Sequence, residues 1–271
     1  MERSDSPYHA VLASETRQPR LVAFDLDDTL APSKSPLDPS MAERLTALLD
    51  VVPVCVISGG QFGQFSKQVI DRLTDASPSA LGRLHLMPTC GTQYYRFVDG
   101  AWTKVYAQDL SDDEKTRAMT AVESEARRLG YWEEKTWGAI LEDRGSQITF
   151  SALGQSAPID RKAAWDPTGE KKNTLRAAVQ ELLPGLEVRS GGSTSVDITR
   201  RGIDKAYGIG RLSELTAIRL TDMLFIGDRL DPDGNDYPVL ALGVPTLAVT
   251  GWEHTVEVLD ELIPQLTPQR G

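Results

Sequence analysis

The sequence has little cysteine and no long apolar run. Its two cysteines, Cys55 and Cys90, are far apart among 271 residues, so neither a disulfide framework nor a thiolate zinc site is indicated. No run reaches the roughly 18 apolar residues that span a bilayer, and the first residues lack the apolar stretch of a signal peptide. We therefore expect a cytoplasmic protein, with loosely ordered ends at residues 1 to about 18 and after about Pro264.

Basic residues are also in deficit. The 29 lysines and arginines are outnumbered by 39 aspartates and glutamates, which gives a formal net charge of -10. A surface of this sign repels nucleic acids and anionic membranes, so we expect neither as a partner. An anionic small molecule would have to be bound by cations placed locally. The three histidines are scattered and suggest no histidine chemistry.

Apolar runs alternate with helical patterns near both ends of the chain. Short apolar runs bounded by polar residues predict buried parallel strands, and apolar residues at helical spacing follow them. Such strands are predicted at 21–27, 51–58, 84–88, 222–228 and 245–251. The alternation predicts an α/β fold with a doubly wound, Rossmann-like parallel sheet.

The middle of the chain has a different pattern. Residues 93–107 alternate in polarity around Asp99-Gly100, a dipeptide that favours a tight hairpin turn. A capping box from Ser111 to Glu114 then opens a helix, and further strand and helix patterns follow. We therefore predict a discontinuous core domain and an inserted α+β domain, with bounds 1–92 and 198–271 for the core and 93–197 for the insert.

The first chemically distinctive motif is Asp25-Leu26-Asp27-Asp28-Thr29, at the end of a predicted strand. A carboxylate can attack phosphorus to form an aspartyl phosphate. A second acid two residues later can protonate the leaving oxygen and then activate water. These roles assign Asp25 as the nucleophile and Asp27 as the acid/base. The alternative is an acidic turn that merely follows a strand.

Two further motifs gain weight only beside the first. Ser58-Gly59-Gly60 ends a strand and opens a helix, so its hydroxyl and amides suit a phosphate oxygen, although such turns are common without any function. Lys205 opens a helix before the last acidic loop. A lysine there would hold the nucleophile and the phosphate together and offset developing charge, unless it is an ordinary surface residue.

The loop after the strand at 222–228 is rich in oxygen ligands. Asp228, Asn235 and Asp236 offer the hard oxygens that Mg²⁺ prefers. Calcium is the rival ion, but the loop lacks the glutamate at the twelfth position of an EF-hand and follows a strand. All four motifs end a predicted core strand or open a core helix. Together they predict a magnesium-dependent site for phosphoryl transfer.

These motifs resemble those of the haloacid dehalogenase (HAD) superfamily over nearly the whole chain. The residues that carry the resemblance are Asp25-x-Asp27-x-Thr29, Ser58, Lys205 and Gly227-Asp228 with Asn235-Asp236. The insert is similar to the C2-type cap of subfamily IIB, which contains sugar phosphatases and the eukaryotic-type phosphomannomutases. The resemblance implies that Asp25, Asp228 and the backbone carbonyl of Asp27 hold Mg²⁺.

The resemblance to the mutases extends into the cap. Gly191-Gly192-x2-Ser195-x-Asp197 is similar to their sugar-binding strand, and Arg144 and Arg161 stand where they have phosphate-binding arginines. The sequence departs from the mutases at Gln155, which stands in place of an arginine, and at Lys34, which approximately replaces another. A lysine cannot bind a phosphate with the planar fork of an arginine, so a second phosphate would be held less tightly.

Several functions remain open at this point. The leading hypothesis is a sugar-phosphate phosphatase, because a phosphatase only has to admit water and needs fewer cap arginines. The second is a phosphomannomutase, which interconverts hexose 1- and 6-phosphates and is activated by a hexose 1,6-bisphosphate. Two weaker hypotheses are a catalytically silent sugar-phosphate-binding protein and a HAD enzyme for nucleotides or lipid-linked phosphates. The resemblance also implies a homodimer that pairs through the cap.

Overall fold

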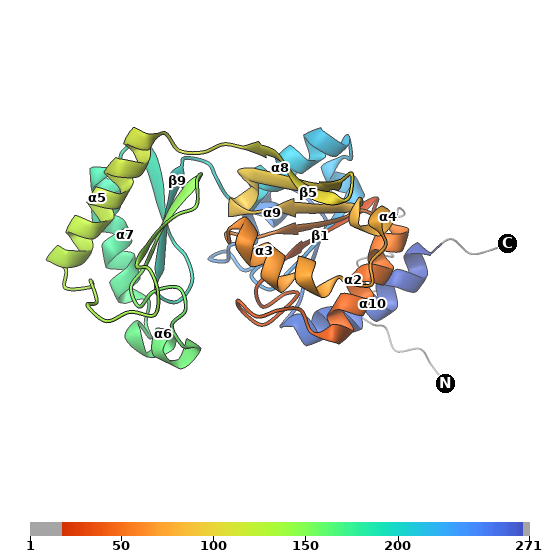
Figure 1. Cartoon of the computed structure of the whole chain (residues 1–271), viewed down its shortest axis with the longest axis horizontal. Coiled ribbons are helices and arrows are strands. Elements are labelled where there is room, and N and C mark those ends of the chain that lie inside the picture. Colours follow the sequence, from red (N-terminus) through yellow and green to blue (C-terminus); the bar gives the residue numbers. More distant parts are fainter. Residues whose placement is uncertain (1–17, 268–271) are drawn as a thin grey trace. The chain divides into compact units, whose positions relative to one another are not determined.

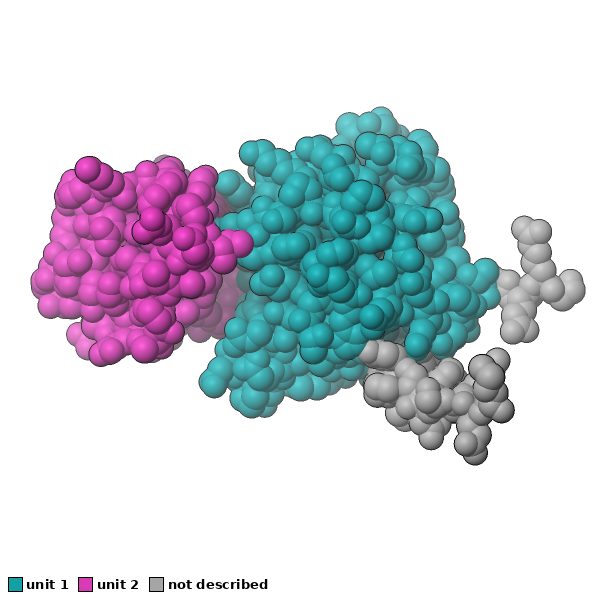
Figure 2. All heavy atoms as spheres, turned by 90° about the horizontal axis from the view of Figure 1, so that it is seen from below, with its two compact units in different colours: residues 1–106, 204–271 teal, residues 107–203 magenta. Residues whose placement is uncertain are grey.

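The computed structural model describes residues 18–267. The chain divides into two compact units, one of residues 1–106 and 204–271 and the other of residues 107–203 (Figure 2). The first 17 residues, predicted to be loosely ordered, lie outside the described part. Near the other end, the last helix continues through Pro264 as far as Leu266, beyond the residue where we predict the tail to begin.

Between residues 18 and 267, a seven-stranded sheet forms the centre of the first unit, in the order β11-β10-β1-β2-β3-β4-β5. Figure 1 shows the first unit with two of these strands, β1 and β5, labelled. The strands of the sheet pair in parallel from β11 to β3, whereas β4 pairs with β3 in antiparallel. The strand bounds are Leu21–Asp25 (β1), Val54–Ile57 (β2), Leu84–Met87 (β3), Gln93–Val98 (β4), Ala101–Ala107 (β5), Met223–Gly227 (β10) and Thr246–Ala248 (β11).

Helices cover both faces of this sheet, because its strands carry apolar residues on both. Phe24 of β1 packs on the side of α2, α3 and α10, and its neighbour Ala23 packs on the side of α8 and α9. The predicted Rossmann-like α/β fold is thus confirmed. The helix bounds are Pro39–Val51 (α2), Phe62–Gln68 (α3), Pro78–Leu81 (α4), Lys205–Thr216 (α8), Tyr237–Ala241 (α9) and Trp252–Leu266 (α10), with short turns η1 (Ile70–Arg72), η2 (Thr89–Gly91) and η3 (Leu220–Asp222).

The predicted hairpin at 93–107 forms, but it belongs to the core sheet. Asp99 and Gly100 both have positive φ, 51° and 81°, as a two-residue hairpin turn of the favoured hand requires. The first strand of the hairpin pairs with β3, where Arg96 lies opposite His85. The antiparallel pattern of a segment does not reveal which sheet its outer edge joins. The first unit therefore extends to Tyr106, past residue 93 where we predict the insert to begin.

The second unit packs two long helices against a four-stranded antiparallel sheet, in the order β6-β7-β9-β8. The predicted capping box is confirmed, since the Ser111 hydroxyl accepts from the Glu114 amide and the Glu114 carboxylate accepts from the Ser111 amide. None of the described helices is long and apolar enough to cross a membrane. The bounds are Asp112–Arg128 (α5), Leu141–Asp143 (β6), Gln147–Ser151 (β7), Ile159–Trp165 (α6), Glu170–Leu182 (α7), Leu186–Ser190 (β8) and Ser195–Arg200 (β9).

The sheet of the second unit has one apolar and one polar face. Side chains alternate between the two faces along each strand. Ile148, Phe150, Val196 and Ile198 pack with α5 and α7 in one apolar cluster. The alternate residues, including Thr149 and Ser151 of β7 and Ser195 and Asp197 of β9, therefore lie on the opposite, polar face. The predicted sugar-binding strand presents its polar residues on this face.

Candidate active site

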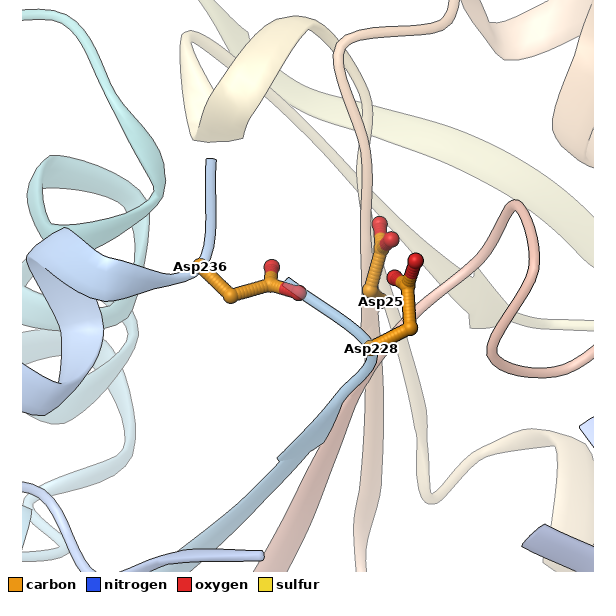
Figure 3. A group of neighbouring side chains, drawn as sticks. All are labelled: Asp25, Asp228 and Asp236. Carbon is orange, nitrogen blue, oxygen red and sulfur yellow. The ribbon is translucent and has the colours of Figure 1, made fainter. Parts of the chain in front are cut away.

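Three carboxylates of the first unit converge where β1 and β10 end (Figure 3). Asp25 is the last residue of β1, Asp228 follows β10, and Asp236 precedes α9. Within residues 18–267 they form a group in which one oxygen of each lies within 4.8 Å of the others. The two strands pair in parallel, with Phe24 opposite Ile226. Their carboxyl ends therefore deliver Asp25 and Asp228 to the same edge of the sheet, and the loop before α9 brings Asp236 to them.

Lys205 bridges two of these carboxylates. Its Nζ lies 2.6 Å from Oδ1 of Asp25 and 2.6 Å from Oδ1 of Asp236, and only 2% of its side chain is exposed. Burial opposes the charged form of Lys205, but the two aspartates together raise its pKa above the ordinary value. One ammonium for three carboxylates leaves the site with an excess of negative charge.

Burial is the main cause of the raised pKa values of two of these carboxyl groups. Burial raises the pKa of Asp25 to about 8, against the opposing effect of Lys205. The pKa of Asp228 is also raised, chiefly by burial and then by the charge of Asp236. A buried site with oxygen ligands and too little positive charge is the chemical complement of a divalent cation.

The position of Lys205 depends on close contact between α8 and the turn at 89–91. A Cβ built on Gly208 would lie 2.7 Å from the carbonyl oxygen of Cys90, and a Cβ on Gly91 would overlap the Cα of Gly208. Real Cβ atoms do not approach other atoms so closely. Glycine at both positions thus lets the helix lie close enough to the sheet to bury the lysine.

Asp236 is fully buried and fixed in orientation. Its Oδ1 accepts from Lys205, and its Oδ2 accepts from the backbone amide of Arg229 at 3.1 Å. A Cβ on Gly227 would lie 2.8 Å from the Asp236 Cγ, so a side chain there would displace the carboxylate. Asn235, a predicted metal ligand, is exposed and directly precedes Asp236 in the same loop.

The turn after β1 contains Asp28 and Thr29, and Thr29 contacts Asp228 of the carboxylate group. Asp28 has a φ of 63°, a left-handed conformation in which aspartate is enriched. Thr29, which is fully buried, donates from Oγ1 to Oδ1 of Asp228 at 3.2 Å. The motif contains Thr29, but the sequence did not indicate this contact, because its partner lies 199 positions away.

Asp27 points its carboxylate at α3. Its Oδ1 accepts from the backbone amide of Lys34 at 2.6 Å and from Nε2 of Gln68 at 3.3 Å, and its Oδ2 accepts from Nε2 of Gln64 at 2.9 Å. The two glutamines were missed by sequence reasoning. The available signal was two amides at i and i+4 on the helix that follows Ser58-Gly59-Gly60, a spacing that places them on one helix face.

The Ser58 turn is anchored by η2, the turn that follows β3. The amide of Gly60 donates to Ser58 Oγ at 3.1 Å, and the carbonyls of Ser58 and Gly60 accept from the amides of Cys90 and Thr89, both at 2.9 Å. Thr89 and Cys90 have φ of 49° and 54°, which a β-branched residue such as Thr89 rarely adopts. A Cβ on Gly59 would meet nothing within 4 Å, so this turn has open space beside it.

The polar face of the second unit carries a connected set of polar groups. Asp197 Oδ1 accepts from Thr149 Oγ1 at 2.7 Å, and the hydroxyls of Ser195 and Ser151 lie 3.3 Å apart. Gln155 joins this set, since its Nε2 donates to Ser151 Oγ at 2.6 Å. Gln155, which we predict to replace an arginine of the mutases, is thus an amide that bonds to a serine.

The two predicted phosphate-binding arginines differ in their surroundings. Arg144 is bonded to Glu142, with Nη2 2.8 Å from Oε2, and its side chain is 9% exposed. Arg161 on α6 has a side chain that is 68% exposed, with Asp160 at 3.9 Å.

Gly192 lies in the turn before β9, where its carbonyl accepts from the amide of Ser195 at 3.3 Å. Lys34 is exposed in the first unit and has a φ of 58°.

A family model described as eukaryotic phosphomannomutase matches residues 129–265, about half of the 271 residues. The chain belongs to the eukaryotic phosphomannomutase family. The matched region contains Lys205, Asp228 and Asp236 of the site, together with the polar strands of the second unit.

Individual relatives and structures agree with this phosphomannomutase family assignment. Phosphomannomutase 1 of Homo sapiens is 23% identical over 235 residues, which cover 84% of this chain and 86% of the relative. A probable phosphomannomutase of Caenorhabditis elegans is 25% identical over 234 residues, covering 82% and 86%. A haloacid dehalogenase-like hydrolase from Bacteroides thetaiotaomicron has a similar fold, with a TM-score of 0.59 at 14% identity, over 90% of this chain and 100% of that one. The chain is therefore an enzyme of the HAD type that catalyses phosphoryl transfer.

Proposed function

We propose that this chain is a phosphatase that hydrolyses a sugar phosphate, with Asp25 as its covalent nucleophile and Mg²⁺ as its cofactor. The observation that carries the proposal is the buried Asp25 carboxylate at the end of β1, bonded to Lys205 and grouped with Asp228. A buried carboxylate between an ammonium and a second acid is suited to attack phosphorus while the developing charge is offset.

The reaction has two halves. In the first, an oxygen of Asp25 bonds to phosphorus, the bond from phosphorus to the substrate oxygen breaks, and Asp27 gives a proton to that oxygen. In the second, water attacks phosphorus, Asp27 takes a proton from the water, and the bond to Asp25 breaks to release phosphate. Lys205 stays cationic throughout and offsets the charge on the phosphoryl group.

The donor set fits a magnesium ion. Asp25 and Asp228 would hold it through carboxylate oxygens and Asp27 through its backbone carbonyl. Asp236 and Asn235 would complete the site from the last loop, and Asp236 would act mainly by orienting Lys205, since both its oxygens already accept hydrogen bonds. When bound, the cation neutralises the phosphoryl oxygens and so favours attack by an anionic carboxylate.

Substrate contacts are proposed in both units. Ser58 and Gly59 would bind the transferred phosphoryl group through the open turn. Gly192, Ser195 and Asp197 would hold the sugar hydroxyls, for which a face of hydroxyl and carboxylate groups is suited. Lys34, Arg144 and Arg161 would supply the cations for any second phosphate. Arg144 is already paired with Glu142, and the neutral side chain of Gln155 adds no positive charge to this set. The second unit is therefore poorly suited to hold a bisphosphate.

A phosphomannomutase is the second candidate, and the family match over residues 129–265 favours it. A mutase must hold a hexose bisphosphate in two orientations and protect its phosphoenzyme from water. That task needs strong cations in the second unit, whereas hydrolysis of a monophosphate does not. The amide at Gln155 therefore favours the phosphatase, and the family assignment favours the mutase.

One paired assay separates the candidates. The wild type, Asp25→Asn and the exposed control Asp71→Asn would be incubated with Mg²⁺ and either mannose 1-phosphate or glucose 1-phosphate, with and without glucose 1,6-bisphosphate. Both free phosphate and hexose 6-phosphate would be followed. We expect free phosphate from the wild type and Asp71→Asn but not from Asp25→Asn. Hexose 6-phosphate formed only with the bisphosphate would instead establish the mutase.

Inosine monophosphate belongs in the same assay as a further substrate. The IMP-bound structure of an N-terminally truncated IMP-nucleotidase from Plasmodium falciparum shares the fold, with a TM-score of 0.70 at 15% identity, over 95% of this chain and 71% of that one. Release of phosphate from this nucleotide and not from the hexose phosphates would overturn the sugar as substrate class. It would leave the role of Asp25 intact.

A homodimer that pairs through the second unit is proposed on family resemblance. Light scattering coupled to size-exclusion chromatography would test it. The dimer predicts a mass near twice the 29.7 kDa of one chain. A mass equal to that of one chain at micromolar concentration would contradict it.

A further inference from the structure

We infer that Gln64 and Gln68 of α3 are positioning residues for Asp27, and that the proton in each half-reaction moves at Oδ2 of that carboxylate. The inference rests on the proposed function, because it assumes that Asp27 is the acid/base and assigns a different role to each of its two carboxylate oxygens. The motifs alone indicated neither the two glutamines nor which oxygen of Asp27 transfers the proton.

The first observation is that Oδ1 of Asp27 accepts hydrogen bonds from two donors. One is the backbone amide of Lys34, at 2.6 Å. The other is Nε2 of Gln68, whose residue is only 2% exposed and which also donates to the carbonyl of Ser35 at 2.7 Å. A buried side-chain amide that is bonded on two sides and a backbone amide already occupy Oδ1, so Oδ1 serves as an anchor.

The second observation is that Oδ2 has a single donor among residues 18–267. That donor is Nε2 of Gln64, at 2.9 Å, on a side chain that is partly exposed. The amide lies directly over Gly60, where a Cβ would approach within 2.7 Å of the Gln64 Cδ. The glycine therefore leaves room for the amide beside Asp27. Because Oδ2 accepts from this one donor, only the contact with Gln64 must change when Oδ2 gains or loses a proton.

A glutamine amide suits this position because it has a donor and an acceptor at the same end. Its NH₂ group donates to Oδ2 while Asp27 is ionised, and its oxygen accepts from Oδ2 when Asp27 carries the proton. In the first half-reaction that proton passes to the leaving oxygen as its bond to phosphorus breaks. In the second, Oδ2 takes a proton from water as the bond between phosphorus and Asp25 breaks.

The test depends on the leaving group. A hexose alkoxide needs a proton to depart, whereas p-nitrophenolate leaves without one, so a residue that positions the acid matters only for the first kind of substrate. The wild type, Gln64→Leu and the control Gln61→Leu would be compared by rapid quench with glucose 6-phosphate and p-nitrophenyl phosphate. Gln61 lies just before α3, is exposed, and makes no capping hydrogen bond through its side chain.

We expect Gln64→Leu to slow phosphorylation of Asp25 by glucose 6-phosphate roughly ten-fold, part of the ~10²- to 10⁴-fold that a general acid contributes. Phosphorylation by p-nitrophenyl phosphate should change by less than about two-fold, KM should change little, and Gln61→Leu should match the wild type. Gln68→Met should show the same preference for the activated substrate. Because Gln68 is buried, its thermal unfolding would be followed in parallel, and the Gln64 comparison decides the matter if that variant does not fold.

The outcomes separate this inference from the proposed function. If the wild type forms no Asp25-dependent phosphoenzyme with either substrate, the proposed function falls and this inference falls with it. If the wild type is active but Gln64→Leu slows both substrates equally, or slows neither, the positioning role alone is overturned.

Discussion

The ammonium of Lys205 lies 2.6 Å from Oδ1 of Asp236, and the two side chains are 2% and 0% exposed. The same nitrogen bonds to Asp25, so one cation holds together carboxylates from opposite ends of the sequence.

Replacement of Lys205 by methionine would leave the buried side chains of Asp25 and Asp236 without their cation. Removing one partner of a buried ion pair typically costs about 3–5 kcal/mol, because the remaining charge has lost its water and its partner. We expect Lys205→Met to lower the free energy of unfolding by about that amount, measured in urea without divalent cations. The exposed Lys67 on α3 is the control, and Lys67→Met should change it by less than about 0.5 kcal/mol. Equal effects of the two variants would contradict the buried bridge.

Gly208 and Gly210 offer a matched pair of glycines on α8. A Cβ at Gly208 would press against the turn at 89–91, whereas a Cβ at Gly210 would meet nothing within 4 Å. Gly208→Ala should therefore destabilise the protein by about 1–3 kcal/mol and lower kcat by displacing Lys205. Gly210→Ala should instead stabilise the helix by about 0.5–1 kcal/mol with kcat unchanged. Thermal unfolding and steady-state kinetics measure both, and a harmless Gly208→Ala would refute the close contact.

Magnesium should stabilise the folded protein through the carboxylate group. A ligand at 100 times its Kd adds about 2.7 kcal/mol to the folded state if it does not bind the unfolded chain. We expect Mg²⁺ to raise the unfolding temperature of the wild type and to have little effect on Asp228→Asn. Asp233→Asn changes an exposed aspartate of the same loop and should respond like the wild type. Loss of the response in Asp233→Asn alone would place the cation elsewhere in the loop.

The titration of Asp25 predicts a pH dependence of stability in the absence of divalent cations. Burial raises the pKa of Asp25 from 3.8 to about 8. Because a raised pKa in the folded state means that folding binds a proton, this contribution to stability is complete below about pH 4 and is lost as the pH rises toward 8. Asp25→Asn removes the dependence and still leaves Lys205 paired with Asp236.

Urea unfolding of the wild type and Asp25→Asn in EDTA, from pH 5 to 9, would measure this difference. The variant should become progressively more stable relative to the wild type up to about pH 8, and the difference should then level off. A difference that stays constant from pH 5 to 9 would contradict the raised pKa and would show that Lys205 keeps Asp25 ionised over this range.

Much of the fold followed from local patterns. The apolar run that ends in Asp25 predicted a buried strand delivering acids to a sheet edge, and the capping box at Ser111 predicted the start of α5 correctly. The boundary between the two units at the hairpin of 93–107 could not be predicted from the sequence. Its alternating residues predict two strands, but the pairing of Arg96 with His85 is a contact between separate segments that alternation does not encode.

The sequence indicated part of the chemistry of the site, and the tertiary structure decided the rest. The types of residue in the motifs, above all Asp25, Asp27 and Asp228, indicated phosphoryl transfer because few other arrangements of acids after parallel strands suit a phosphate and a cation. The packing of α8 on the turn at 89–91 decided that Lys205 is buried between two carboxylates. The folded arrangement of α3 decided that two glutamines hold Asp27. Such contacts depend on side-chain direction and on the space left by Gly60 and Gly208, and these are set only when distant segments pack together.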